Sequence, residues 1–116
     1  MSFTLSAFTF LCVLCISIGQ LLFKKAASAL PSVFSVAALL QNGWLIAALA
    51  LYGVTTLGWI WILRHAPLHL AYPFMGLAFL IVPTLAWLFL GEPMHWRTLT
   101  GGVLIMAGVA LASTNG

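Results

Sequence analysis

Residues 2–23 read SFTLSAFTFLCVLCISIGQLLF and are followed at once by Lys24 and Lys25. The stretch contains no charged side chain, and its few polar groups are hydroxyls, thiols and one amide. A helix of about 20 apolar residues is long enough to cross the hydrocarbon core of a bilayer. The sequence therefore opens with a predicted transmembrane helix that ends at a basic pair.

The rest of the chain has the same character. Hydrophobic residues make up 64% of the 116 residues and charged residues 4%, and the mean hydropathy is +1.19. A soluble domain carries roughly a quarter charged residues. Because so few charges cannot cover a surface that faces water, lipid is the expected solvent. We predict an all-α integral membrane protein, with residues 1–116 forming one domain.

Charged residues and helix breakers divide the remaining chain. The uncharged stretch after Lys25 is longer than one helix needs, and Pro31 and the Gln41-Asn42-Gly43 cluster interrupt it. Residues 32–40 are too short to cross, so we expect them to lie along the interface or to extend the second span. Four transmembrane helices are predicted, at about 2–23, 44–63, 68–90 and 99–113.

An even number of spans places both termini on one side. Arg64 lies on the side of the termini, and Lys24, Lys25 and Arg97 lie on the other. The excess of basic residues marks the cytoplasmic side. The count favours termini outside, although so small a bias also permits insertion in both orientations.

The third span contains Pro73 and Pro83, with Gly76 between them. Each proline removes a backbone hydrogen bond and tends to kink a helix. A bendable helix is what a moving gate uses, and kinked spans also occur in rigid membrane proteins. Both interpretations remain open.

The fourth span carries small residues on one face, at Gly101, Gly108 and Ala112. Small residues let two helices approach closely, which promotes helix association in lipid. This face packs either inside the chain or against a second copy. We favour an oligomer, because four short helices enclose little volume alone.

Polar residues of the first span form a stripe. Ser17, Gln20 and Lys24 are spaced i, i+3 and i+7, so they share one helix face. Lysines at helix ends also extend routinely to the lipid headgroups. We assign that role to Lys25, and for Lys24 a substrate role is equally open. Near the other end, close to Tyr72, Arg64 could anchor to lipid phosphate or receive a phosphate-bearing ligand.

Metal and enzyme chemistry are not expected. Cys12 and Cys15 lie inside a span without a second ligand pair, and Pro67 separates His65 from His69 with no carboxylate nearby. No nucleophile, base and acid form a plausible set, and no cofactor is indicated. Four scattered basic residues are not a nucleic-acid patch.

The only acidic residue is Glu92, in the predicted loop after the third span. Proton-coupled exporters of cationic drugs need an acid inside the membrane. The spans of this chain offer only neutral or cationic polar groups. Such a set suits an anionic headgroup better than a cation.

Three motifs together resemble the four-helix branch of the drug/metabolite transporter superfamily, close to the small multidrug resistance proteins and EamA-like. The first is Ile18-Gly19-Gln20 with Lys24. The third span opens with Pro67 and Ala71-Tyr72 and closes with Phe89-Leu90-Gly91-Glu92-Pro93. In the fourth span a pattern that forms the family's dimer contact matches Gly102, Leu104, Ile105, Gly108 and Val109.

Two departures separate the chain from the drug exporters. Ile16 stands where those proteins carry their essential glutamate, and Met75 stands where they place a tryptophan after the gate tyrosine. Gly19-Gln20 with Lys24, together with Ala71-Tyr72-Pro73, is more similar to the subunits of the undecaprenyl-phosphate-aminoarabinose flippase.

That resemblance implies a homodimer or heterodimer with a similar four-helix protein. The pair would move a lipid-linked sugar phosphate across the bacterial inner membrane by alternating access. Gln20, Lys24, Arg64 and Tyr72 would line the headgroup path, with Ser17 on the same stripe. Two alternatives remain: an exporter of small cationic or amphipathic compounds, and a non-transporting partner subunit of a glycan-assembly complex.

Overall fold

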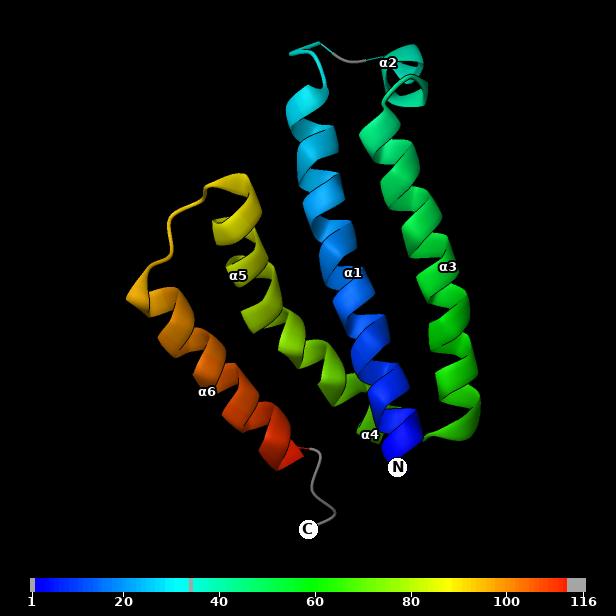
Figure 1. Ribbon diagram of the computed structural model, residues 1–116, viewed down its shortest axis with the longest axis vertical. Helices are drawn as coiled ribbons and strands as arrows, with labels where there is room; N and C mark the ends of the chain where they lie inside the picture. Colours follow the sequence, from blue (N-terminus) through cyan, green and yellow to red (C-terminus); the bar gives the residue numbers. More distant parts are fainter. Residues whose placement is uncertain (1, 34, 113–116) are drawn as a thin grey trace.

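The computed structural model describes residues 2–33 and 35–112, and all of its regular elements there are helices (Figure 1). Successive long segments run in alternating directions, so α6 ends near the end of the bundle at which α1 begins. In chain order the elements are α1 (Phe3–Ala29), α2 (Val36–Leu40), α3 (Gly43–His65), α4 (Leu68–Ala71), the 3₁₀ helix η1 (Tyr72–Leu77), α5 (Ala78–Leu90) and α6 (Trp96–Ala112).

Helix length and composition confirm the predicted fold class. Three helical segments are long and apolar enough to cross a membrane, namely Phe3–Ala29, Gly43–His65 and Leu68–Leu90, and the shorter apolar helix Trp96–Ala112 makes the fourth. The chain is therefore a small multi-pass membrane protein of four helices. The predicted end of the fourth span, Ser113, lies outside the described residues.

The helices extend further than the predicted spans. α1 continues past Lys24 and Lys25 to Ala29, whereas the predicted first span ends just before the lysines. A lysine does not end a helix, because its aliphatic stem can follow the helix surface while the ammonium group reaches the headgroups. Charge therefore marks where the hydrocarbon ends, and the backbone keeps its helical hydrogen bonds beyond that point.

α1 and α3 form one antiparallel pair, and α5 and α6 lie beside each other on the opposite flank of the molecule (Figure 1). Between α1 and α3, the Cys12 Sγ donates to the Thr55 backbone oxygen at 3.5 Å. The Phe8 and Trp61 rings pack with centroids 5.2 Å apart. The core cluster of buried residues comprises Leu5, Cys12, Ile62, Ala66 and Ala71.

Asn42 fastens the far end of this pair. Its Oδ1 accepts from the Leu45 amide at 3.2 Å and caps α3, while its Nδ2 donates to the Ala26 backbone oxygen at 2.8 Å. The side chain is 8% exposed. One buried amide therefore caps one helix and ties it to the last turn of another.

The connection between α1 and α3 contains a separate short helix. α2 spans five residues and ends at the Gln41-Asn42 break before α3 begins. Of the two expectations for residues 32–40, extension of the second span is therefore wrong, because Asn42 starts a new helix with its own cap. Val36 and Leu40 of α2 are largely exposed.

The third span changes helix type where its breakers lie. Residues 72–77 form a 3₁₀ helix that has Pro73 in its first turn and includes Gly76. A stretch of 3₁₀ helix within a span often marks a hinge or local strain. Gly76 is buried against α6, and a Cβ there would lie 2.6 Å from a methyl group of Val109.

Pro83 lies inside α5. Because proline has no amide hydrogen, it leaves the carbonyl of Phe79 without the usual helical partner. The Phe79 oxygen faces Gly102 of α6, where a Cβ would lie 3.4 Å from that oxygen and 2.5 Å from the Leu80 side chain. Gly102 thus lets α6 approach the backbone of α5 at the position that Pro83 opens.

Candidate functional site

The polar stripe of α1 combines one buried and two exposed residues. Ser17 is fully buried, and its hydroxyl donates to the Val13 backbone oxygen at 2.8 Å. Gln20 and Lys24, on the same face, are exposed. The helix face therefore changes within one turn from closed packing at Ser17 to an accessible surface at Gln20.

The accessible part of the stripe has a defined chemistry. Gln20 offers an amide with two donors and an acceptor, and Lys24 offers an ammonium group with three donors. The two residues are four apart, so they stand one above the other on the helix. Together they can donate to the oxygens of an anionic headgroup, and Lys24 supplies the charge.

Ser17 has no such capacity in this conformation. Its single donor is already used by the Val13 carbonyl, and none of its surface is exposed. Thr9 and Thr55 are buried in the same way, and each donates to a backbone oxygen of its own helix. These three buried hydroxyls thus have hydrogen-bond partners in the backbone of their own helices. The place of Ser17 on a substrate path stays a prediction.

Arg64 and Tyr72 lie at the other end of the bundle. Arg64 belongs to the last turn of α3, and Tyr72 begins η1 after the α3–α4 turn; both are exposed. α3 has 23 residues, which at 1.5 Å per residue corresponds to roughly 33 Å. The structure therefore does not bring these two residues together with Gln20 and Lys24, and the predicted path residues lie toward opposite ends of α1 and α3.

An aromatic stack accompanies the Arg64 end. The rings of Trp61 and His65 lie 4.5 Å apart, and the His65 Nδ1 is 2.9 Å from the Trp61 backbone oxygen. The indole of Trp61 also contacts Phe8 of α1. The stack places His65 against its own helix.

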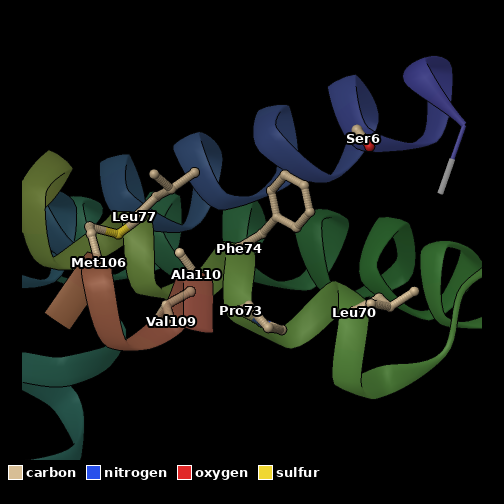
Figure 2. A pocket seen from close by; sticks show the side chains of 8 residues that line it. All are labelled: Ser6, Leu70, Pro73, Phe74, Leu77, Met106, Val109 and Ala110. Carbon is tan, nitrogen blue, oxygen red and sulfur yellow. The ribbon is translucent and has the colours of Figure 1, made fainter. Parts of the chain in front are cut away.

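A lateral groove of about 420 Å³ lies between α1, the third span and α6 (Figure 2). Apart from Ser6 of α1, its lining is apolar. The remaining lining residues come from the α4–η1 segment and from α6: Leu70, Pro73, Phe74, Leu77, Met106, Val109 and Ala110. A groove of this largely apolar composition can hold a hydrocarbon chain.

This groove was not predicted from the sequence. Its lining combines three helices that are distant along the chain, so no local pattern marks it. Pro73 was singled out as a kink, and the same 3₁₀ segment that contains it supplies the Phe74 and Leu77 side chains. The kink and the groove thus belong to one feature of the structure.

The five predicted dimer-contact residues of α6 separate into two groups. Gly102 and Val109 pack within the chain, against Leu80 and Gly76 respectively. Leu104, Ile105 and Gly108 are exposed, and nothing lies within 4 Å of a Cβ placed on Gly108. A role in dimerisation stays a prediction for all five, and only the exposed group is accessible to a second chain in this conformation.

Within residues 2–33 and 35–112, no group of three or more His, Cys, Asp or Glu side chains is arranged to hold a metal ion.

Comparison with known proteins gives consistent matches. A protein of Sodalis glossinidius is 37% identical over 98 residues, which cover 84% of this chain and 86% of the relative. A protein of Serratia proteamaculans is 38% identical over 98 residues, covering 84% of each chain. A protein of Pectobacterium atrosepticum is 36% identical over 98 residues, covering 82% of this chain and 85% of the relative.

All three relatives bear the name "Probable 4-amino-4-deoxy-L-arabinose-phosphoundecaprenol flippase subunit ArnE". Flippase subunits are transport proteins rather than enzymes. No protein-family model matches the chain, and no solved structure matches it.

Proposed function

The chain belongs to the ArnE family of flippase subunits, and from this premise we propose that it helps to move 4-amino-4-deoxy-L-arabinose-phosphoundecaprenol across the bacterial inner membrane. The observation that carries the proposal is the match to three relatives over most of both chains. The described geometry adds physical support at each part of such a substrate.

The exposed pair on α1, Gln20 and Lys24, supports the part of the proposal that concerns the headgroup. A sugar phosphate crossing hydrocarbon loses most of its hydration, and a charged group in the bilayer is costly. Lys24 and Gln20 can replace part of that hydration with donors to the phosphate and sugar oxygens. Because Glu92 is the only acidic residue of the chain, no carboxylate in a span would repel the phosphate.

The groove at η1 supports the part of the proposal that concerns the lipid tail. A polyprenyl chain is apolar, and the groove offers an apolar lining from Phe74, Leu77 and Met106. The tail can follow such a surface or remain in lipid while the headgroup crosses. Headgroup and tail thus have separate surfaces, one polar and one apolar.

We propose that the functional unit is a dimer of four-helix chains. The relatives are named subunits, and the four helices of one chain leave Gln20 and Lys24 of α1 and the outer face of α6 uncovered. A second chain, identical or similar, would enclose the path from Gln20 and Lys24 to Arg64 and Tyr72. Alternating access would then arise from movement of one flank against the other, about the 3₁₀ segment with Pro73 and Gly76 and the helix interior at Pro83.

A reconstitution experiment tests the proposal. Vesicles containing the purified chain, alone and with its co-purified membrane partner, receive a fluorescent polyprenyl-phosphate amino sugar in the outer leaflet. Transfer to the inner leaflet is read from protection against an impermeant quencher. We expect faster transfer than in protein-free vesicles, and a larger acceleration by the protein than for a neutral polyprenol of equal tail length.

The same vesicles distinguish the exporter alternative. Ethidium efflux driven by a proton gradient, and abolished when the gradient is dissipated, would contradict the proposal. An exporter of that kind needs an acid in the membrane, and Ile16 occupies the relevant position here. Absence of lipid transfer in every combination of chains would instead favour a non-transporting partner.

A further inference from the structure

Two basic side chains at one end of the bundle each lie over a tryptophan ring. The Lys25 Nζ is 4.9 Å from the centroid of Trp44, and the guanidinium carbon of Arg97 is 5.6 Å from that of Trp96. Both distances fall within the roughly 6 Å that defines a cation–π contact. The first pair joins α1, one turn before its end, to the first turn of α3, and the second pair lies in the first turn of α6.

Lys25 is separate from the candidate path. Consecutive residues of an α-helix are about 100° apart, so Lys25 leaves the face that holds Ser17, Gln20 and Lys24. Its side chain turns to α3 instead, where it meets Trp44. Transport through the α1 stripe therefore does not require this lysine.

The Lys25–Trp44 pair is held in place by buried structure. Asn42 donates to the oxygen of Ala26, the residue after Lys25, and caps the helix that begins just before Trp44. Both partners of the cation–π pair are therefore attached to a fixed backbone junction. Trp44 is 45% exposed and Trp96 70% exposed, so lipid can reach both residues.

The charge of this end is complementary to anionic lipid. It carries three basic residues, Lys24, Lys25 and Arg97, against the single acidic residue Glu92, with His95 beside Trp96. Tryptophan prefers the headgroup level of a bilayer, and basic residues near the membrane surface attract anionic headgroups. A tryptophan with a cation over its face thus presents a flat interfacial group and a phosphate partner together.

We propose that Lys25 with Trp44, and Arg97 with Trp96, form two binding seats for the phosphate headgroups of anionic phospholipids, which anchor this end of the bundle. The seats act independently of transport. They make the protein select anionic over zwitterionic neighbours at α1, α3 and α6.

Tryptophan fluorescence tests the seats. A full-length chain with W59F, W61F and W87F keeps only Trp44 and Trp96 as reporters. It is placed in bilayers that contain phosphatidylglycerol or phosphatidylcholine with brominated acyl chains, which quench nearby indoles. We expect brominated phosphatidylglycerol to quench in preference to brominated phosphatidylcholine. In the same background K25Q should lower the preference at Trp44 about fivefold and R97Q the preference at Trp96 by a similar factor, and the double variant should lower it at both indoles.

Two controls keep the test decisive. S28A changes an exposed side chain of α1 near Lys25 without altering the charge and should leave the preference unchanged, and the pair K25R and R97K should retain it. Equal quenching by the two lipids would overturn the proposal, as would a preference that survives K25Q and R97Q together. Protection of both indoles from either lipid would also overturn it, because a second protein chain would then cover the seats.

Discussion

At the residue scale, the fate of each polar side chain depends on whether its own helix satisfies it. Ser17 lies one turn from Gln20 on the same face, yet only Ser17 is buried with its donor used. A hydroxyl can donate to the carbonyl four residues earlier, whereas the longer amide of Gln20 extends away from the backbone. Short hydroxyl residues can therefore enter the bundle, and longer polar residues need a surface or a ligand.

Asn42 gives the clearest prediction at this scale. Asn42→Ala removes the cap of α3 and the bond to Ala26, so we expect a loss of about 2–3 kcal/mol in the free energy of unfolding. Asn42→Asp keeps an acceptor for the Leu45 amide but sets a buried carboxylate oxygen against the Ala26 oxygen, so it should lose at least as much. Unfolding in detergent micelles, followed by circular dichroism, measures both.

The neighbouring residue supplies the control. Gln41 is exposed, and Gln41→Ala should stay within about 0.5 kcal/mol of the parent chain. If Asn42→Ala unfolds as Gln41→Ala does, the clamp between α1 and α3 contributes no stability.

At the scale of the elements, the third span and α6 fit together through two glycines. Gly76 and Gly102 each lie where a Cβ would meet a neighbouring side chain, while Gly108 faces open space. The glycines of α6 thus have different roles even though they belong to one helix. The inner glycine permits close packing within the chain.

Alanine substitutions separate these roles. Gly102→Ala and Gly76→Ala should each destabilise the fold by about 1–3 kcal/mol through overpacking. Gly108→Ala should be neutral or slightly stabilising, because alanine favours a helix by up to about 1 kcal/mol over glycine. Thermal unfolding in micelles is the measurement, and equal losses at all three positions would contradict the assignment.

A bulkier change on the outer face tests association. Gly108→Ile should leave the helical content intact and lower the fraction of paired chains, which sedimentation in density-matched micelles reports. A normal paired fraction in Gly108→Ile would remove the outer face of α6 from the interface.

The elements also show what the sequence could and could not predict. Hydropathy and charge predicted the four-helix class, because a segment that crosses lipid must be apolar over a fixed length. The 3₁₀ form of residues 72–77 did not follow from Pro73 and Gly76 alone, since prolines also occur in ordinary kinks. The contacts of Gly102 depend on a carbonyl that Pro83 frees in another helix, and no local pattern encodes such a pairing.

The candidate site was predictable to a similar degree. Helical spacing placed Gln20 and Lys24 on one face, and both are exposed together. Spacing also grouped Ser17 with them, but burial depends on how α1 packs against its neighbours, which the sequence of α1 does not contain. The groove at η1 required the positions of three helices and was missed.

At the scale of the whole molecule, the distribution of basic residues favours one orientation. Three of the four Lys and Arg residues, namely Lys24, Lys25 and Arg97, fall in the predicted first and third loops, on the side opposite the predicted side of the termini, and basic residues favour the cytoplasmic side. We expect the C-terminus to lie outside, so an alkaline phosphatase fusion there should be active and a fluorescent protein fusion dark. Equal signals from both fusions would indicate dual insertion, and the reverse pattern would contradict the orientation.

The proposed transport path would span the whole molecule, from Lys24 to Arg64. The central claim of the proposed function is that Lys24 binds the phosphate of the lipid-linked sugar. The most direct measurement is the rate at which vesicles bearing Lys24→Ala transfer a fluorescent polyprenyl-phosphate amino sugar. Ser28→Ala, at the same end of α1, is the matched control, and Lys24→Arg restores the charge. The account predicts a loss of at least about tenfold in Lys24→Ala, partial recovery in Lys24→Arg and a normal rate in Ser28→Ala; an unchanged rate in well-folded Lys24→Ala would contradict it.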